Sequence, residues 1–500
     1  MKMTMQCTKT FWSRREFLFR SGGGVSGLAL AHLLNQDGLL AHESAPASSA
    51  CDAKAAGFNP YAPKKPHFKP RATAVISLFM SGGVSHVDTF DPKPALMRYA
   101  GQPLDGRVAG DVIVRQGYPG PLMPSPFGFR RYGQSGIDVS EIFPNIGSLV
   151  DDIAFVRSVY GQSNDHVQAT YEMQMGQTRM GFPSLGSWVT YGLGSENASL
   201  PAYVVIHDAR GGPLGGVNDW SSGFIPAAYQ GTLFRATGDP IVDLKPPSGA
   251  NGASAVSEVE QRARLDLLAK LNELDMQQYP GNSDLAARIS SYELAFRMQG
   301  CAPEALDVAR ESDATRKLYG LDDKITEPFG RQCLMARRLV EHGVRFVQLF
   351  HGGMGNQNVD TWDAHGDVKS NHSHHAAESD RPIAGLLTDL KARGLLDSTL
   401  VIWHGEFGRM PISQRGVGRD HNPGAMTVWM AGAGIRGGQA IGASDEFGYK
   451  AEQQPISYHD LHATILHLLG VDHRKLTYRF NGRDMRLTDV YGVPIPQIIA

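Results

Sequence analysis

The feature of this sequence that most constrains its fold is an alternation of short apolar runs with longer helical patterns. Apolar runs of strand length occupy residues 72–80, 201–206, 344–350, 399–403 and 425–430. Apolar residues at helical spacing occupy residues 258–279, 284–299, 327–342 and 380–393. Strands that alternate with helices form mostly parallel sheets whose faces the helices cover. We therefore predict an α/β fold with a mostly parallel central sheet and helices on both faces.

Polar or glycine-rich loops follow three of these strands, which end at Met80, Phe350 and Trp403. In open α/β sheets the ligand crevice lies beyond the carboxyl ends of the strands. We therefore expect the three loops to meet at one edge of the sheet.

The amino-terminal segment has the pattern of an export signal. Residues 13–18 read SRREFL, and a glycine-rich, weakly apolar run extends from Phe17 to Leu40. This pattern resembles a twin-arginine signal, although a surface helix with adjacent arginines is the alternative. We predict a signal and processing region at 1–50, a linker at 51–71, and export to the periplasm or cell envelope. No later run supplies the ~18 consecutive apolar residues of a permanent membrane span.

Charge and cysteine usage exclude some classes of partner. The chain has 48 Lys+Arg against 50 Asp+Glu and no long basic run, which argues against duplex nucleic acid as a partner. Outside the signal, Cys51, Cys301 and Cys333 have no zinc-binding spacing. An oxidising compartment would permit a bond between the last two, and the sequence leaves this open.

Histidines are concentrated between residues 351 and 421, which hold seven of the eighteen. Asp363 and His365 stand two apart after a strand, a spacing that lets both face one ion. Glu406 follows the next strand, and His421 precedes another. These four residues predict a site for a divalent metal ion. The alternatives are a hydrogen-bonded loop histidine and an ion pair between Glu406 and Arg409. A further group, His372, His374 and His375, resembles a metal-binding tract, but an exposed helix start explains it equally well, and it is left out of the site.

Five segments, taken in this order, resemble one bacterial family. They are SLFMSGGVSHVDTFDPKP (77–94), CLMARRLVEHGVRFVQLF (333–350), WDAHG (362–366), LLDSTLVIWHGEFGRMP (395–411) and GRDHNP (418–423). The set resembles the domain-of-unknown-function family numbered 1501, which is similar to the sulfatases and belongs with the alkaline phosphatase superfamily. The resemblance implies a single sulfatase-like α/β domain at 72–490, followed by a tail at 491–500. It also implies hydrolysis of sulfate or phosphate esters with one or two divalent metals.

The superfamily pattern assigns metal ligands by position. Asp363 and His365 match the carboxylate and histidine of one site, and His421 matches the late histidine that completes it. Glu406 stands where the second site has an aspartate, but the neighbouring histidine of that site is Phe407 here. The resemblance therefore implies a three-ligand site and puts the second site in doubt.

Two further positions depart from the superfamily pattern. Ser81 stands where the first strand usually supplies an aspartate, which leaves Asp88 or His86 as substitute ligands. His166 stands at the position of the sulfatase nucleophile. Either His166 or Ser163 could supply a nucleophile, a base or another ligand, and the alternative is a cap for the helix through Met173.

The expected function is an exported metal-dependent hydrolase of sulfate or phosphate esters, on a small-molecule or carbohydrate substrate. Zinc, calcium and manganese are equally compatible with the pattern. Arg409 would steady the anionic leaving side. The alternative is a catalytically inactive, sulfatase-like envelope protein that binds an anionic glycan or a partner, which Ser81 and Phe407 favour.

Overall fold

The computed structural model describes residues 61–115, 117, 119–236, 240–241, 244, 256–278, 283–353 and 360–500. The predicted export signal and residues 51–60 of the predicted linker lie outside these residues. The chain divides into two compact units, Met1–Ala53 with Lys245–Leu285 and Lys54–Leu244 with Ala286–Ala500. The described part of the first unit is helix α8 (Glu258–Gln278) and the start of α9 (Ser283–Leu306). The second unit contains the sheet and the candidate site.

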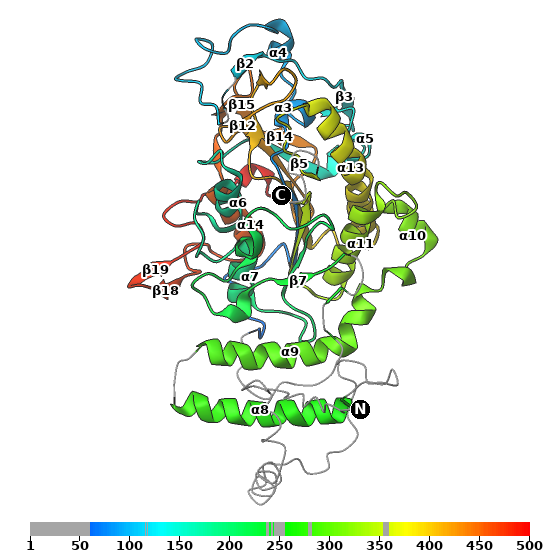
Figure 1. Cartoon of the computed structure of the whole chain (residues 1–500), viewed down its shortest axis with the longest axis vertical. Coiled ribbons are helices and arrows are strands. Elements are labelled where there is room, and N and C mark those ends of the chain that lie inside the picture. The colour runs from blue at the N-terminus through cyan, green and yellow to red at the C-terminus, as the bar shows by residue number, and fades with distance from the viewer. Residues whose placement is uncertain are drawn as a thin grey trace, which may run out of the picture. The chain divides into compact units, whose positions relative to one another are not determined.

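A nine-stranded sheet forms the centre of the second unit (Figure 1). Its strands are β1 (Ala74–Met80), β5 (Ile153–Tyr160), β6 (Tyr203–Ile206), β7 (Thr232–Phe234), β8 (Phe346–His351), β9 (Thr399–His404), β13 (Met426–Ala431), β14 (Gln439–Ile441) and β17 (Ile456–Ser457). Their order is β14-β5-β13-β9-β1-β8-β6-β7, with β17 also paired to β5. Strand β13 runs antiparallel to both neighbours, and the other pairings are parallel. The predicted α/β class with a mostly parallel sheet is confirmed.

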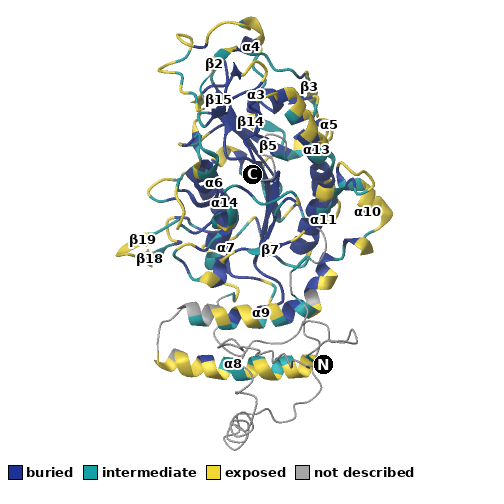
Figure 2. Ribbon diagram, in the orientation of Figure 1, coloured by how far each residue is buried: buried dark blue, intermediate teal, exposed yellow. Residues whose placement is uncertain are grey.

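Both faces of this sheet are covered by helices, as strand β1 illustrates. Ile76 and Leu78 pack in one buried cluster with residues of α11 (Glu327–Glu341) and α13 (Val368–Ala392). Val75 and Phe79 pack in a second cluster with α7 (Leu185–Leu193) and α14 (Tyr458–Leu468). Successive residues of a strand point to opposite faces, so one apolar run supplies both cores. Strands β1, β8, β9 and β13 are accordingly buried along their length, while helix α13 exposes part of its outer side (Figure 2).

Helix α13 differs most from its predicted bounds, because it begins at Val368 and not at 380. The side chain of Asp367 caps it by accepting hydrogen bonds from the backbone N–H groups of Lys369 and Ser370. Its first turns are rich in polar residues, yet His372 and His375 are fully buried there. Tertiary packing therefore extends a helix that apolar periodicity does not reveal.

Strands β1, β8 and β9 are parallel neighbours, with Met80 opposite His351 and Phe79 opposite His404. Their carboxyl ends therefore lie at one edge of the sheet, and the loops after them approach each other there. Among the described residues, no helix is both long and apolar enough to cross a membrane. Cys333, for which a bond with Cys301 was left open, is a buried free thiol.

Candidate metal centre

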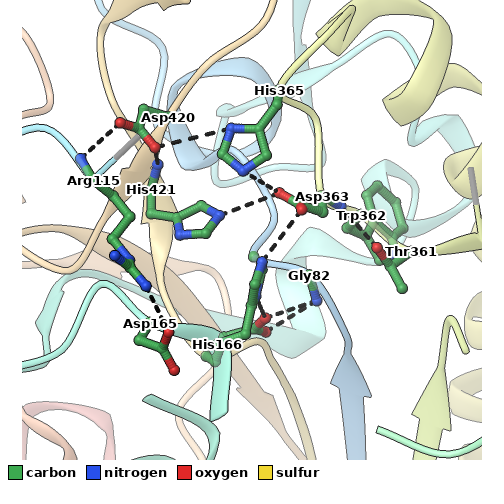
Figure 3. A network of polar contacts seen from close by, with 12 residues as sticks. Gly82, Arg115, Asp165, His166, Thr361, Trp362, Asp363, His365, Asp420 and His421 are labelled. Atoms are coloured by element: carbon green, nitrogen blue, oxygen red, sulfur yellow. Dashed lines mark hydrogen bonds and ion pairs between the residues drawn. The ribbon is translucent and has the colours of Figure 1, made fainter. Parts of the chain in front are cut away.

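Four side chains from three separate parts of the chain converge at this edge of the sheet. His166 is the first residue of helix α6 (His166–Met175), Asp363 and His365 follow β8, and His421 begins the short strand β12 (His421–Asn422). One donor atom from each lies within 4.8 Å of the others. Figure 3 shows the three imidazoles arranged around the carboxylate of Asp363. The structure thus brings the three predicted ligands together and adds His166.

In each of the three histidines, Nε2 faces the Asp363 carboxylate. The Nε2 atoms of His365 and His421 lie 3.0 and 3.2 Å from Oδ1, and Nε2 of His166 lies 3.3 Å from Oδ2. Metal–ligand bonds near 2 Å place the donors of one site roughly 3 to 4 Å apart. The spacing therefore fits four ligands of a single ion.

The opposite ring nitrogen of each histidine is held by an oxygen. Nδ1 of His421 lies 2.7 Å from the backbone carbonyl of Asn164, and Nδ1 of His365 lies 2.5 Å from Oε1 of Gln414. A carbonyl oxygen can only accept a hydrogen bond, so Nδ1 of His421 donates. In a neutral imidazole this leaves a lone pair on Nε2, directed at Asp363. Outer oxygens that fix this tautomer are typical of metal-binding histidines.

The ionisation states of these side chains also favour a cation between them. Burial opposes ionisation of Asp363, but the guanidinium of Arg409 outweighs it and lowers the pKa of the carboxyl. Burial also lowers the pKa of His421 well below its ordinary value, so its ring is neutral. An imidazole lone pair and an ionised carboxylate then face each other at 3.2 Å. A divalent cation fits this arrangement of donors.

Arg409 lies inside the protein and is fully buried. Its Nη2 donates to Oδ1 of Asp363 at 2.6 Å, and its other nitrogens donate to the backbone carbonyls of Gly83 and Arg419. These contacts hold the Asp363 carboxylate in position. They correct the prediction that Arg409 steadies a leaving group, because no part of its guanidinium is exposed.

The structure places Asp88 and His86 outside the cluster, in the short helix α3 (His86–Thr89). The carboxylate of Asp88 is paired with the guanidinium of Arg419 at 2.6 and 3.0 Å, and both side chains are fully buried. Nε2 of His86 lies 2.9 Å from the backbone carbonyl of Gly448. These partners correct the prediction that either residue replaces the missing first-strand carboxylate.

Glu406 lies next to the cluster but is not one of its four converging residues. Its carboxylate accepts hydrogen bonds from the backbone N–H of Gly82 at 2.8 and 3.2 Å and from Nδ1 of His166 at 2.7 Å. Gly82 has a φ of +111°, and a Cβ there would come within 2.5 Å of the backbone nitrogen of Asp363. The glycine therefore permits the close approach of these loops. Glu406 orients His166, in place of the second-site ligand role expected for it.

Ser163 belongs to the start of helix α6. Its hydroxyl donates to Oε1 of Gln168 at 3.1 Å and accepts from the backbone N–H of Asp165 at 3.1 Å. Asp165 is the N-cap residue. Ser163 thus stabilises the turn before α6 and is not one of the four converging residues; its role as a nucleophile or base stays a prediction.

Two hollows border Asp363. An open cleft of about 550 Å³ is lined by Asp363, His365, Asp367, His374 and Arg415, among others. A small cavity of about 20 Å³, large enough for one water molecule, is lined by residues that include Ser81, His166, Thr361, Asp363 and Glu406. Arg415, which sequence reasoning missed, is the guanidinium in the cleft lining. Its position before Gly416 in a tight turn, where its φ is +49°, is the signal that could have marked it.

A second group, His351, His375 and Glu378, also has converging donor atoms. Trp362 Nε1 donates to Nδ1 of His351 at 3.0 Å, and an indole N–H cannot accept. The proton of His351 is therefore on Nε2, which faces Oε2 of Glu378 at 3.1 Å. Nδ1 of His375 faces the same oxygen at 3.0 Å. Nδ1 of His375 is thus hydrogen-bonded to this carboxylate, whereas Nε2 of His351 contacts it without hydrogen-bond geometry.

A comparison with protein-family models identifies the family. The family described as "Protein of unknown function (DUF1501)" matches residues 72–499. The chain belongs to this family. None of the curated proteins compared with the DUF1501 chain matches it.

Solved structures similar to the DUF1501 chain include hydrolases of several kinds. A sulfatase from Pseudoalteromonas sp. is 14 % identical, with a TM-score of 0.33 and coverage of 81 % of this chain and 68 % of that one. An alkaline phosphatase from the Antarctic bacterium TAB5 is 10 % identical, with a TM-score of 0.32 and coverage of 80 % and 98 %. A phosphonate monoester hydrolase from Silicibacter pomeroyi is 12 % identical, with a TM-score of 0.28 and coverage of 66 % and 68 %.

Proposed function

We propose that this protein is a metal-dependent hydrolase of sulfate or phosphate esters that acts in the periplasm or cell envelope after twin-arginine export. The observation that carries the proposal is the pair formed by His421 and Asp363. An acceptor nitrogen and an acceptor oxygen lie 3.2 Å apart in a buried site, and Nδ1 of His421 is already committed to the carbonyl of Asn164. This arrangement is stable with a cation between the two groups.

The residues of the site would have different roles in such an enzyme. Asp363, His365 and His421 would hold the ion, which when bound polarises an ester oxygen and lowers the pKa of water. Arg409 contacts Asp363 and Gln414 contacts His365, and these contacts hold the two ligands in position. Arg415 lines the cleft next to Asp363 and His365, where its exposed guanidinium can bind a sulfate or phosphate group. Water would cleave the ester into an alcohol and free sulfate or phosphate.

One observation favours a second candidate, an inactive sulfatase-like protein that binds an anionic glycan or a partner. The ring of Phe407 packs against His421 and His166, with ring centroids 4.4 and 5.0 Å apart. Phe407 occupies the place where the superfamily pattern expects a second-site ligand, so any activity would depend on one metal.

A substrate screen separates the two candidates. The purified full chain is assayed with aryl sulfates, phosphate monoesters and phosphate diesters in the presence of Zn²⁺, Mn²⁺ or Ca²⁺. We expect turnover that His421→Ala abolishes and that His67→Ala, at an exposed histidine outside both hollows, retains. Metal-loaded protein without turnover on any of these esters would support the binding protein, and turnover that survives His421→Ala would contradict the proposed site.

A further inference from the structure

We infer that His166 is a fourth ligand of this metal centre and that Glu406 positions it. This inference rests on the proposed metal site and adds to it a residue that occupies the place of the sulfatase nucleophile.

The first argument is that His166 repeats the geometry of the other two histidines. Its Nδ1 is anchored on a carboxylate oxygen of Glu406 at 2.7 Å, and its Nε2 faces Oδ2 of Asp363 at 3.3 Å. In His421 and His365 the anchors are the carbonyl oxygens of Asn164 and Gln414. A pattern shared by three rings from different elements indicates one common ligand role.

The second argument is that His166 is held in place by the fold and has little freedom to turn away. It is the first residue of α6, directly after the N-cap residue Asp165. Its ring lies against the rings of His421 and Phe407, with centroids 4.3 and 5.0 Å apart. Glu406, in turn, is fixed by two contacts from the backbone of Gly82. A ring held on both sides is preorganised to bind an ion.

This ligand set also selects the metal. Three imidazole nitrogens and one carboxylate suit an ion of the zinc class, whereas calcium prefers six to eight oxygen ligands. Four protein ligands would complete a tetrahedron around zinc, so water or an ester oxygen would have to add as a fifth ligand. With His166 bound, no histidine remains at that position to attack a substrate, and any hydrolysis would use water directly.

Equilibrium metal titration tests the inference without an activity assay. Metal-free full-length protein is titrated with Zn²⁺, Mn²⁺ and Ca²⁺ against a chromophoric chelator. We expect affinity in the order Zn²⁺, Mn²⁺, Ca²⁺. We expect Glu406→Gln to weaken Zn²⁺ binding by about 10-fold to 100-fold, as for other outer contacts, and His166→Ala to weaken it further. His374→Ala is the matched control and should bind as the wild type does.

The outcomes distinguish this inference from the proposed function. A wild-type protein that binds none of the three ions would overturn the metal centre as a whole. Unchanged or tighter Zn²⁺ binding by His166→Ala would leave the three-ligand centre intact and overturn the fourth ligand, because His166 would then be a cation that competes with the metal. Tighter binding of Ca²⁺ than of Zn²⁺ would also overturn it. If His166→Ala fails to fold, His166→Gln and Glu406→Gln supply the same comparison.

Discussion

At the scale of single residues, the structure separates charges that face the cleft from charges buried behind the ligands. Arg409 is fully buried on Asp363, whereas Arg415 is exposed in the cleft lining. The sequence placed Arg409 correctly near the site, because it follows β9 and precedes β12. Whether Arg409 or Arg415 faces solvent depends on tertiary packing, which the local sequence pattern does not indicate.

Arg415→Ala should weaken binding of an anionic ester. Losing one partly exposed, charge-assisted contact costs about 1.5 kcal/mol, which corresponds to roughly a 10-fold higher KM with kcat little changed. Arg415→Lys should restore part of the loss, because it keeps the charge but not the planar fork. Arg479→Ala, at an exposed arginine of the β18–β19 hairpin (Tyr478–Phe480 and Arg483–Met485), is the control. An unchanged KM in Arg415→Ala would contradict a part in substrate binding.

Asp88→Asn should destabilise the protein without removing its metal. The substitution leaves the fully buried guanidinium of Arg419 without its counter-charge, which typically costs about 3 to 5 kcal/mol. Urea unfolding measures this loss, and plasma mass spectrometry measures the metal. Asp363→Asn is the contrasting variant and should lose the metal. Loss of metal from folded Asp88→Asn would restore Asp88 as a ligand.

At the scale of elements, the sequence predicted strands β1, β6, β8, β9 and β13 but not β5, β7, β14 and β17, and it predicted the helix limits less well. Continuous apolar runs identify β1, β8, β9 and β13 within one or two residues, because strands buried on both faces need apolar residues at every position. The first half of α13 was missed because its residues are polar. Strand β13 runs antiparallel to β9, which is consistent with a connection that contains short strands and no crossover helix.

A buried histidine between two helices makes stability depend on pH. His462 lies on α14, and its Nε2 donates to the carbonyl of Met173 on α6 at 2.7 Å. Burial lowers its pKa to about 3. Below its ordinary value near 6.5, the unfolded chain binds a proton that the folded chain excludes, so stability falls as the pH falls through this range.

His462→Gln should therefore reduce the acid sensitivity of folding. Between pH 7 and pH 5 the titration of one such histidine costs about 2 kcal/mol, which the variant would no longer lose. The free energy of unfolding in urea, measured at both pH values with a chelator present, gives the comparison. Equal pH dependence in the variant and the wild type would show that His462 does not titrate on unfolding.

At the scale of the whole molecule, the site depends on residues that lie far apart in the sequence. The sequence predicted that Asp363 and His365, which follow β8, lie at this edge of the sheet, and its family resemblance added His421, which precedes β13. It did not predict that Asn164 and Gln414 anchor two of the rings, since those contacts join positions 257 and 49 residues apart. In the sequence, residue types near the ends of strands indicate the metal ligands. The residues that anchor the ligand rings are brought into place by tertiary packing.

Export of the protein is a prediction that belongs to the scale of the whole molecule. Replacing Arg14 and Arg15 together by lysine should keep the protein in the cytoplasm, because the twin-arginine pair is the recognised feature of such signals. Cell fractionation measures this, and Arg20→Lys serves as the control that should still be exported. Normal periplasmic accumulation of the double variant would contradict the twin-arginine route.

The central claim is that His421, His365 and Asp363, with His166, bind one metal ion. Anomalous diffraction from crystals grown with Zn²⁺, recorded on both sides of the zinc absorption edge, tests it most directly. We expect one strong zinc peak about 2 Å from the Nε2 atoms of these histidines and from an Asp363 oxygen. The absence of a zinc peak between these atoms in crystals grown with saturating Zn²⁺ would contradict the claim.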